Sequence, residues 1–195
     1  MSETTGFSKQ QGQVLVQLAR VTISEQLGYH VSEEVRHELA QQLADPAYSG
    51  ENGTFVTLKI QGQLRGCIGN LSATGSLAEG VKRNALSAAF EDHRFMPLTA
   101  EELAKVHMEV SVLTDPLPLQ YDGAQDLLDK LRVKVDGVIL RKGMASSTFL
   151  PQVWEQLPDK DAFLSHLCQK AGLQTDAWMQ GDLEISTYQV QYFQE

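Results

Sequence analysis

The sequence predicts an α+β fold in which an antiparallel sheet is flanked by helices. Two observations support this class. Segments with the apolar spacing of helices are interleaved with hairpin-like segments rich in β-branched residues, and the two types do not alternate as a parallel sheet requires. With 195 residues and 42% hydrophobic content, the chain can bury one full core. We therefore expect a flexible N-terminus over residues 1–9 and a single domain over residues 10–195.

Two helices should open the chain. Val14, Leu18 and Val21 have the spacing of one helix face. A second helix should follow Ser32, whose hydroxyl suits an N-cap, and should end at Asp45-Pro46, because helical geometry is disfavoured in a residue that precedes proline.

A β-hairpin is expected next. Thr54–Ile60 is rich in β-branched and aromatic residues, as strands are. Gln61-Gly62 suits a two-residue turn into a second strand over residues 63–69.

The register of this hairpin should bring a thiol and a guanidinium together. A two-residue loop sets Leu58 opposite Arg65 and Val56 opposite Cys67. Since side chains alternate along a strand, Arg65 and Cys67 should share one face. Both polar groups would then lie against an apolar wall.

The segment Leu64-Arg65-Gly66-Cys67-Ile68-Gly69 is the most informative part of the chain. A positive neighbour such as Arg65 favours the thiolate of Cys67, which is the nucleophilic and metal-binding form. Gly66 and Gly69 leave the backbone uncovered, so that a ligand or another chain could approach it closely. These features indicate a candidate site without naming a substrate.

The remaining elements follow from capping boxes, turn residues and apolar periodicity. The predicted helices cover residues 76–90, a short segment from Thr99, residues 122–131, a start at 151–154, and residues 163–171 with Gly172 as the cap. The predicted strands cover residues 106–113, 132–135, 138–141, 146–150 and 185–193, with Asp136-Gly137 as a hairpin turn.

Three polar residues outside the motif join the candidate site. His107 and Glu109 share the polar face of the strand over residues 106–113, where either could handle protons. Asn84 lies on the apolar stripe of a helix and could contact a ligand. We expect Arg65, Cys67, Asn84 and Glu109 to line one cleft.

Each candidate also has a structural interpretation. Cys67 could be a small buried residue of the sheet, and Asn84 a buried amide that holds the backbone in place. Arg65 could be a structural ion-pair partner of Glu109 or Asp92. Glu109 could also be a solvated residue on an exposed strand face.

No motif for a metal or a known cofactor is present in the sequence. The five histidines have no ligand spacing with each other or with the two cysteines, so no metal site is expected. Cys168, on the apolar face of a helix, is assigned to packing. The chain has no phosphate loop, dinucleotide fingerprint or Cys-x-x-Cys pattern, and the cofactor is therefore unknown.

Charge and hydropathy exclude two classes of partner. The formal net charge is −9 and the 16 Lys and Arg residues are scattered, whereas nucleic-acid binding requires a basic stripe or patch. The N-terminus lacks the profile of a signal peptide, and no apolar run approaches the roughly 20 residues of a membrane span. Two cysteines far apart do not make a disulfide framework, so we expect a cytoplasmic protein.

The motif blocks together resemble the AMMECR domain family, whose bacterial and archaeal members are called AmmeMemoRadiSam system protein A. The resemblance covers roughly residues 10–193. The matching blocks, in chain order, are Leu64–Gly69, Asn84-Ala85, Ala88-Ala89-Phe90 with Asp92 and Arg94-Phe95, Glu109–Leu113, Gly137 with Leu140, Phe149–Trp154 and Lys170–Leu173.

This resemblance implies an α+β fold with antiparallel sheet in two lobes, and a cleft near the Arg-Gly-Cys segment. It also implies association with a Memo-like protein and a radical SAM enzyme. It implies no settled reaction, and it leaves the oligomeric state open.

Two hypotheses about function follow. In the first, the chain is an enzyme in which Cys67 is the nucleophile, Arg65 binds an anionic group, and Glu109 or His107 handles protons. Gly66, Gly69 and Asn84 would then surround the substrate. In the second, the chain is a non-catalytic adaptor that presents the same cleft to a Memo-like or radical SAM partner.

Overall fold

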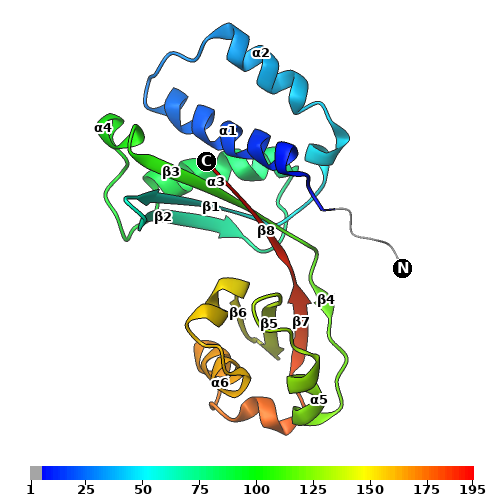
Figure 1. The fold of residues 1–195 in the computed structure, drawn as a ribbon. Coiled ribbons are helices and arrows are strands. Elements are labelled where there is room, and N and C mark those ends of the chain that lie inside the picture. Colours follow the sequence, from blue (N-terminus) through cyan, green and yellow to red (C-terminus); the bar gives the residue numbers. More distant parts are fainter. Residues whose placement is uncertain (1–5) are drawn as a thin grey trace. The chain divides into compact units, whose positions relative to one another are not determined.

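The computed structural model describes residues 6–195 (Figure 1). Within them the chain forms two compact units, one made of the residues up to Leu113 with Gln191–Glu195 and the other of Thr114–Val190. Each unit has its own hydrophobic core and one antiparallel sheet, which confirms the α+β class. Residues 1–5 of the expected flexible N-terminus lie outside the described residues. The expectations of a single domain and of a cleft stay predictions.

The first unit is a four-stranded sheet packed against helices (Figure 1). The strand order is β2-β1-β3-β8, and the core contains residues of α1, α3, β1 and β3, so both helices pack on the same face of the sheet. The elements of this unit are α1 (Lys9–Gln26), α2 (Glu33–Gln42), η1 (Pro46–Ser49), β1 (Thr54–Ile60), β2 (Gln63–Asn70), α3 (Leu77–Phe90), α4 (Ala100–Leu103), β3 (Val106–Leu113) and β8 (Val190–Gln194).

Local signals in the sequence define these elements well. Ser32 caps α2, while Ser76 and Thr99 open α3 and α4 with the predicted capping boxes. Gln61 and Gly62 have φ of 52° and 77°, the left-handed geometry of a two-residue turn that matches strand twist. The predicted hairpin of β1 and β2 is therefore confirmed.

The predicted register of that hairpin is wrong by one residue at the motif. Leu58 lies opposite Gly66 rather than Arg65, and Thr57 lies opposite Cys67. The shift occurs between Leu58 and Lys59, where β2 carries one extra residue, Arg65, in a β-bulge. A bulge bends its strand locally, so Arg65 leaves the simple alternation that the prediction assumed.

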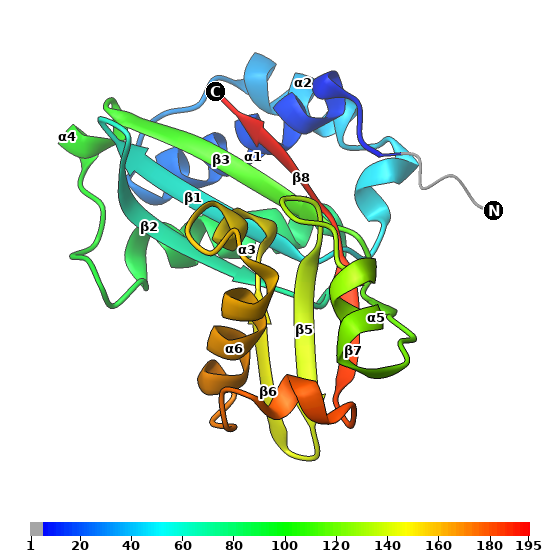
Figure 2. The same cartoon turned by 60° about the horizontal axis from the view of Figure 1, so that its bottom comes forward.

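The second unit contains the sheet β4-β7-β5-β6. Figure 2 shows β5 and β6 as a hairpin with α6 beside β6. Trp154, Phe163 and Trp178 lie in the core of this unit. Its elements are β4 (Leu117–Pro118), α5 (Gly123–Lys130), β5 (Gly137–Lys142), β6 (Ala145–Phe149), η2 (Pro151–Glu155), α6 (Lys160–Lys170), η3 (Ala177–Gln180) and β7 (Glu184–Tyr188).

Two predicted features of this region are wrong. Residues 132–135 form a turn instead of a strand, because the Asp136 carboxylate accepts hydrogen bonds from the Arg132 backbone N–H and guanidinium. The hairpin turn therefore lies between β5 and β6 rather than at Asp136-Gly137. The strand expected over residues 185–193 is divided at Gln189 into β7 and β8, which belong to different sheets.

Candidate functional site

The sheet of the first unit has one face packed against the core and an opposite face that carries most of its polar side chains. Val56, Leu58, Met108 and Val110 are buried against α1 and α3. Because side chains alternate, the residues between them in β1 and β3 point away from that core. We call this side of the sheet the polar face; it carries Thr57, Lys59, Cys67, His107 and Glu109.

Cys67 is at one end of a row across three strands of the polar face. It lies opposite Thr57 in β1, and Thr57 lies opposite Glu109 in β3. The Thr57 hydroxyl donates to Cys67 Sγ at 3.3 Å. Cys67 is half-buried, so its sulfur is held by the sheet without being sealed in the core.

The backbone of Cys67 is held from the open edge of the sheet by two side chains. β2 is the edge strand, and Asp92 Oδ2 accepts the Cys67 N–H at 2.9 Å while Arg94 Nη2 donates to the Cys67 carbonyl at 3.2 Å. Asp92 and Arg94 also pair with each other at 2.7 Å. We call this pair the edge clamp. It takes the place that a neighbouring strand would occupy and fixes the thiol-bearing residue.

The electrostatics of the edge clamp keep it charged. The Arg94 side chain holds the pKa of the Asp92 carboxyl well below its usual range, helped by the N–H groups of Cys67 and Arg94. The pKa of Arg94 is raised, first by Asp92 and to a smaller extent by the nearby Cys67 thiol. Arg94 is therefore a cation beside the thiol, which sequence reasoning missed although it had noted Asp92 and Arg94 as family residues.

Arg65 is engaged elsewhere. Its guanidinium makes two hydrogen bonds to the Glu102 carboxylate, at 2.9 and 3.0 Å, and a third to the Met96 carbonyl at 2.9 Å. Glu102 therefore replaces the expected partners Glu109 and Asp92, which pair with Lys59 and Arg94. The Arg65 contact lowers the pKa of Glu102 to about 2. The guanidinium holds the segment after α3 against the edge of the sheet.

Asn84 and the motif glycines have packing roles. Asn84 is 2% exposed and its amide donates to the Thr54 carbonyl and hydroxyl, so it lies on the core side of the sheet, away from the polar face. A Cβ at Gly66 would lie 2.2 Å from the Ala88 carbonyl oxygen of α3. A Cβ at Gly69 would lie 2.2 Å from the Phe55 ring. The structure therefore does not bring Asn84 and Arg65 together with Cys67 and Glu109.

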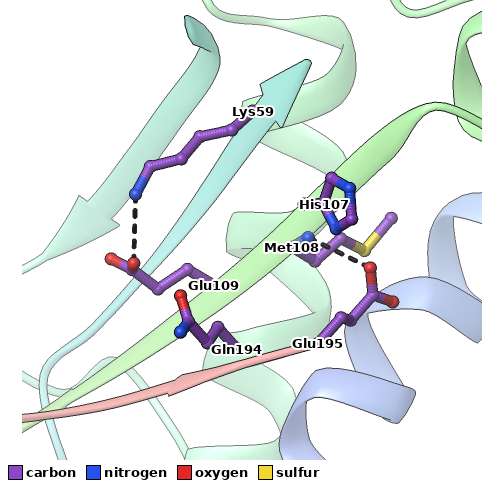
Figure 3. A pocket seen from close by; sticks show the side chains of 6 residues that line it. All are labelled: Lys59, His107, Met108, Glu109, Gln194 and Glu195. Carbon is purple, nitrogen blue, oxygen red and sulfur yellow. Dashed lines mark hydrogen bonds and ion pairs between the residues drawn. The ribbon is translucent and has the colours of Figure 1, made fainter. Parts of the chain in front are cut away.

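His107 and Glu109 do share the polar face, and they line a small pocket (Figure 3). Lys59 Nζ lies 3.2 Å from Glu109 Oε2. Two further residues that line the pocket, Lys59 and Gln194, were not among the predicted site residues. Alternation along Thr54–Ile60 could have found Lys59, since it shares a face with Thr57. Gln194 comes from β8, whose place beside β3 no local signal specifies.

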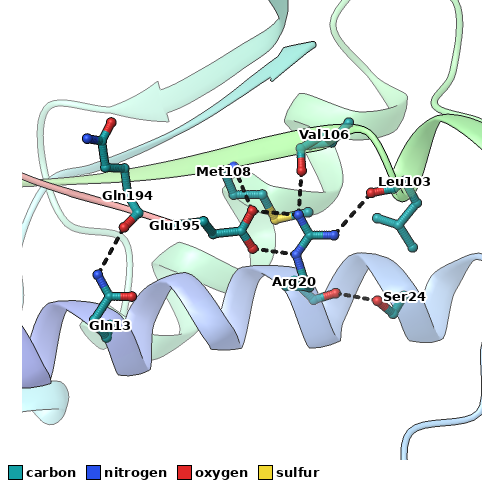
Figure 4. A network of polar contacts seen from close by, with 8 residues as sticks. All are labelled: Gln13, Arg20, Ser24, Leu103, Val106, Met108, Gln194 and Glu195. Carbon is teal, nitrogen blue, oxygen red and sulfur yellow. Dashed lines mark hydrogen bonds and ion pairs between the residues drawn. The ribbon is translucent and has the colours of Figure 1, made fainter. Parts of the chain in front are cut away.

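A polar network lies beside this pocket (Figure 4). Glu195 receives hydrogen bonds from the Arg20 guanidinium of α1 and from the Met108 backbone N–H of β3. Arg20 also donates to the carbonyls of Leu103 and Val106. These contacts fasten the end of β8 and β3 to α1. The Glu195 carboxylate is therefore already bound to Arg20 and to the Met108 N–H.

Residues 6–195 give no support to three further features: a metal site, a reactive second cysteine and a membrane span. In that range no three His, Cys, Asp or Glu side chains are grouped so that they could hold a metal ion. Cys168 is fully buried in α6, and burial raises the pKa of its thiol, as its packing role requires. None of the described helices has the length and apolar character needed to cross a membrane.

Comparison with known proteins shows similarity over nearly the whole chain. The AMMECR1 family model matches residues 16–193. A protein from Thermofilum pendens is 39% identical, with 97% of this chain and 92% of the relative covered. One from Methanothermobacter thermautotrophicus is also 39% identical, covering 97% and 96%. The crystal structure of an uncharacterized protein from Pyrococcus horikoshii has a TM-score of 0.79 and 32% identity, covering 97% of this chain and 93% of that chain.

Proposed function

The chain belongs to the AMMECR1 family, and we propose that it acts in the AmmeMemoRadiSam system as an enzyme whose nucleophile is Cys67. One observation carries this proposal: a half-buried thiol has both of its backbone groups fixed by the edge clamp and its sulfur contacted by a hydroxyl. A nucleophile on a fixed backbone, with its sulfur accessible, is held in one position relative to a bound substrate.

The roles of the neighbouring residues differ from those first expected. Arg94, in place of Arg65, would bind an anionic group of the substrate or stabilise developing negative charge, because it is exposed beside Cys67. Thr57 would hold the sulfur in position through its hydroxyl. Glu109 lies two strands from Cys67, about 10 Å at the usual strand spacing, so it and His107 would handle protons on a part of the substrate that lies over β3.

Partners and location are proposed from the family resemblance. A Memo-like protein and a radical SAM enzyme are the proposed partners, and the cytoplasm is the proposed compartment. The acidic net charge and the half-buried reduced thiol are compatible with that compartment.

The test is site-resolved alkylation. Native protein is treated with iodoacetamide across a pH series, and Cys67 and Cys168 are quantified separately by mass spectrometry. We expect Cys67 to react much faster than Cys168, because Cys168 is fully buried. Arg94→Ala should slow the reaction of Cys67 near neutral pH, whereas the exposed neighbour His93→Ala should not.

Two results would contradict the proposal. If Cys67 reacts only after unfolding, it is a packing residue and not a nucleophile. If Arg94→Ala and His93→Ala give the same rate as the wild type, the cationic role assigned to Arg94 is wrong.

A non-catalytic adaptor is the second candidate, favoured by apolar side chains at the β2 edge. Leu64 is 43% exposed and Met96, whose carbonyl contacts Arg65, is 80% exposed. Exposed apolar groups of this kind occur where proteins bind one another. An adaptor predicts that Met96→Asp weakens capture of a purified Memo-like protein while Cys67→Ser does not. An enzyme that uses the thiol predicts loss of function in Cys67→Ser.

A further inference from the structure

The pocket on the polar face is chemically distinct from the Cys67 thiol. It has a volume of about 130 Å³ and is lined by Lys59, His107, Met108, Glu109, Gln194 and Glu195 (Figure 3). Three strands contribute to it, namely β1, β3 and β8. Its walls therefore combine one ammonium group, carboxylates, an imidazole and an amide within a single small space.

The two charges available to a ligand are those of Lys59 and Glu109. Their ion pair spans 3.2 Å, and the Glu109 side chain is only 14% exposed whereas that of Lys59 is 40% exposed. The carboxylate is thus held close to the sheet, and the lysine is the more exposed of the two side chains. The Glu195 carboxylate is less available, because Arg20 and the Met108 N–H already occupy it (Figure 4).

We propose that this pocket binds a free α-amino acid through its ammonium and carboxylate groups. Glu109 would accept from the ammonium, and Lys59 would swing to pair with the carboxylate. The amide of Gln194 offers one donor and one acceptor, and His107 can supply a further donor. A simple anion would meet Glu109 and a simple amine would meet Lys59, so only a ligand with both charges satisfies both walls.

Energetics and size fit this ligand class. The Lys59 ammonium is 40% exposed, so water screens the existing ion pair, and the ligand would replace that one pair with two. The pocket volume of about 130 Å³ suits a small molecule such as alanine.

The pocket also relates to the proposed function. The row from Glu109 through Thr57 to Cys67 leads from the pocket toward the thiol. An amino acid with a longer side chain could extend along that row, which would give the substrate class of the Cys67 reaction. This last connection rests on the proposed function, whereas amino-acid binding in the pocket does not.

The test is binding of L-alanine to the full chain, measured by calorimetry. Propionate and ethylamine serve as probes of similar size that each carry one charge. We expect millimolar binding of alanine and at least about tenfold weaker binding of either probe. Lys59→Met and Glu109→Gln should each weaken alanine binding by about tenfold or more, whereas the exposed Lys105→Met should not. Circular dichroism verifies that each variant is folded.

Three results would overturn the inference. These are no saturable binding of alanine up to about 50 mM, equal binding of propionate and alanine, and wild-type affinity in both pocket variants. The Cys67→Ser variant should bind alanine as the wild type does. Failure of the alkylation test would therefore leave this result unchanged, and the two proposals can fail separately.

Discussion

Replacement of Asp92 by alanine should loosen β2 at Cys67. Asp92 is one half of the edge clamp, and its side chain is only 4% exposed. It accepts the Cys67 N–H at 2.9 Å and makes two contacts to the Arg94 guanidinium, at 2.9 and 2.7 Å. Removing the carboxylate leaves an edge N–H and a guanidinium without this partner.

The magnitude follows from these contacts. A hydrogen bond to a charged group contributes about 1.5–3 kcal/mol. The Arg94 side chain is 57% exposed, so water screens the ion pair and reduces its contribution to about 0–1 kcal/mol. We therefore expect Asp92→Ala to cost about 2–3 kcal/mol locally, which is about 30- to 150-fold faster amide exchange at Cys67. Asp92→Asn keeps one acceptor oxygen and should cost about half as much.

Hydrogen exchange read by NMR at the Cys67 amide measures this effect directly. The neighbouring His93→Ala is the matched control, since His93 is exposed. An unchanged Cys67 exchange rate in Asp92→Ala would refute the edge clamp as the element that fixes this residue. An equal acceleration in His93→Ala would show that the segment, and not the carboxylate, is responsible.

Two further predictions concern stability. Gly66→Ala should lower the free energy of unfolding by about 2 kcal/mol or more, because the new Cβ would lie 2.2 Å from the backbone oxygen of Ala88. Urea denaturation measures this change, and an unchanged midpoint would contradict the close approach of α3. The pH dependence tests Glu102, whose folded-state pKa is lowered from 4.5 to about 2, first by its hydrogen bonds to Arg65. A carboxyl whose pKa is lower in the folded state stabilises the fold at pH values above its unfolded-state pKa. The stability advantage of the wild type over Glu102→Gln should therefore be full above about pH 4.5 and disappear as the pH falls toward 2. A difference in stability that stays constant over this pH range would refute the role assigned to the Arg65–Glu102 pair.

The elements that the sequence predicted well depend on neighbours in the chain. Ser76 and Thr99 act within a single helical turn, and Gln61-Gly62 needs only its own backbone geometry. The failures have distant causes. Asp136-Gly137 is typical of a hairpin, but the Asp136 carboxylate is taken by Arg132 and the turn lies elsewhere. The alternation over residues 185–193 continues through Gln189, yet Gln189 pairs with Thr114 and the strand is divided.

The candidate site was predictable to a similar extent. Strand alternation correctly placed His107 and Glu109 on one face, because that rule is local. The partner of Arg65 could not be predicted, since Glu102 is distant in the sequence and belongs to a separate helix. The bulge at Arg65 has the same origin: the register depends on where β2 meets α3, which is a property of the folded sheet.

Packing explains most residues of the Leu64–Gly69 motif, and Cys67 is the exception. Arg65 holds the segment after α3 through Glu102, Gly66 permits the approach of α3, and Gly69 makes room for a phenyl ring. Only backbone atoms of Cys67 take part in the edge clamp, so any residue at that position would be held equally well. The fold therefore has no evident need for a thiol there. A side chain that the packing does not require, on a backbone that the packing fixes, supports the proposal that Cys67 acts through its sulfur.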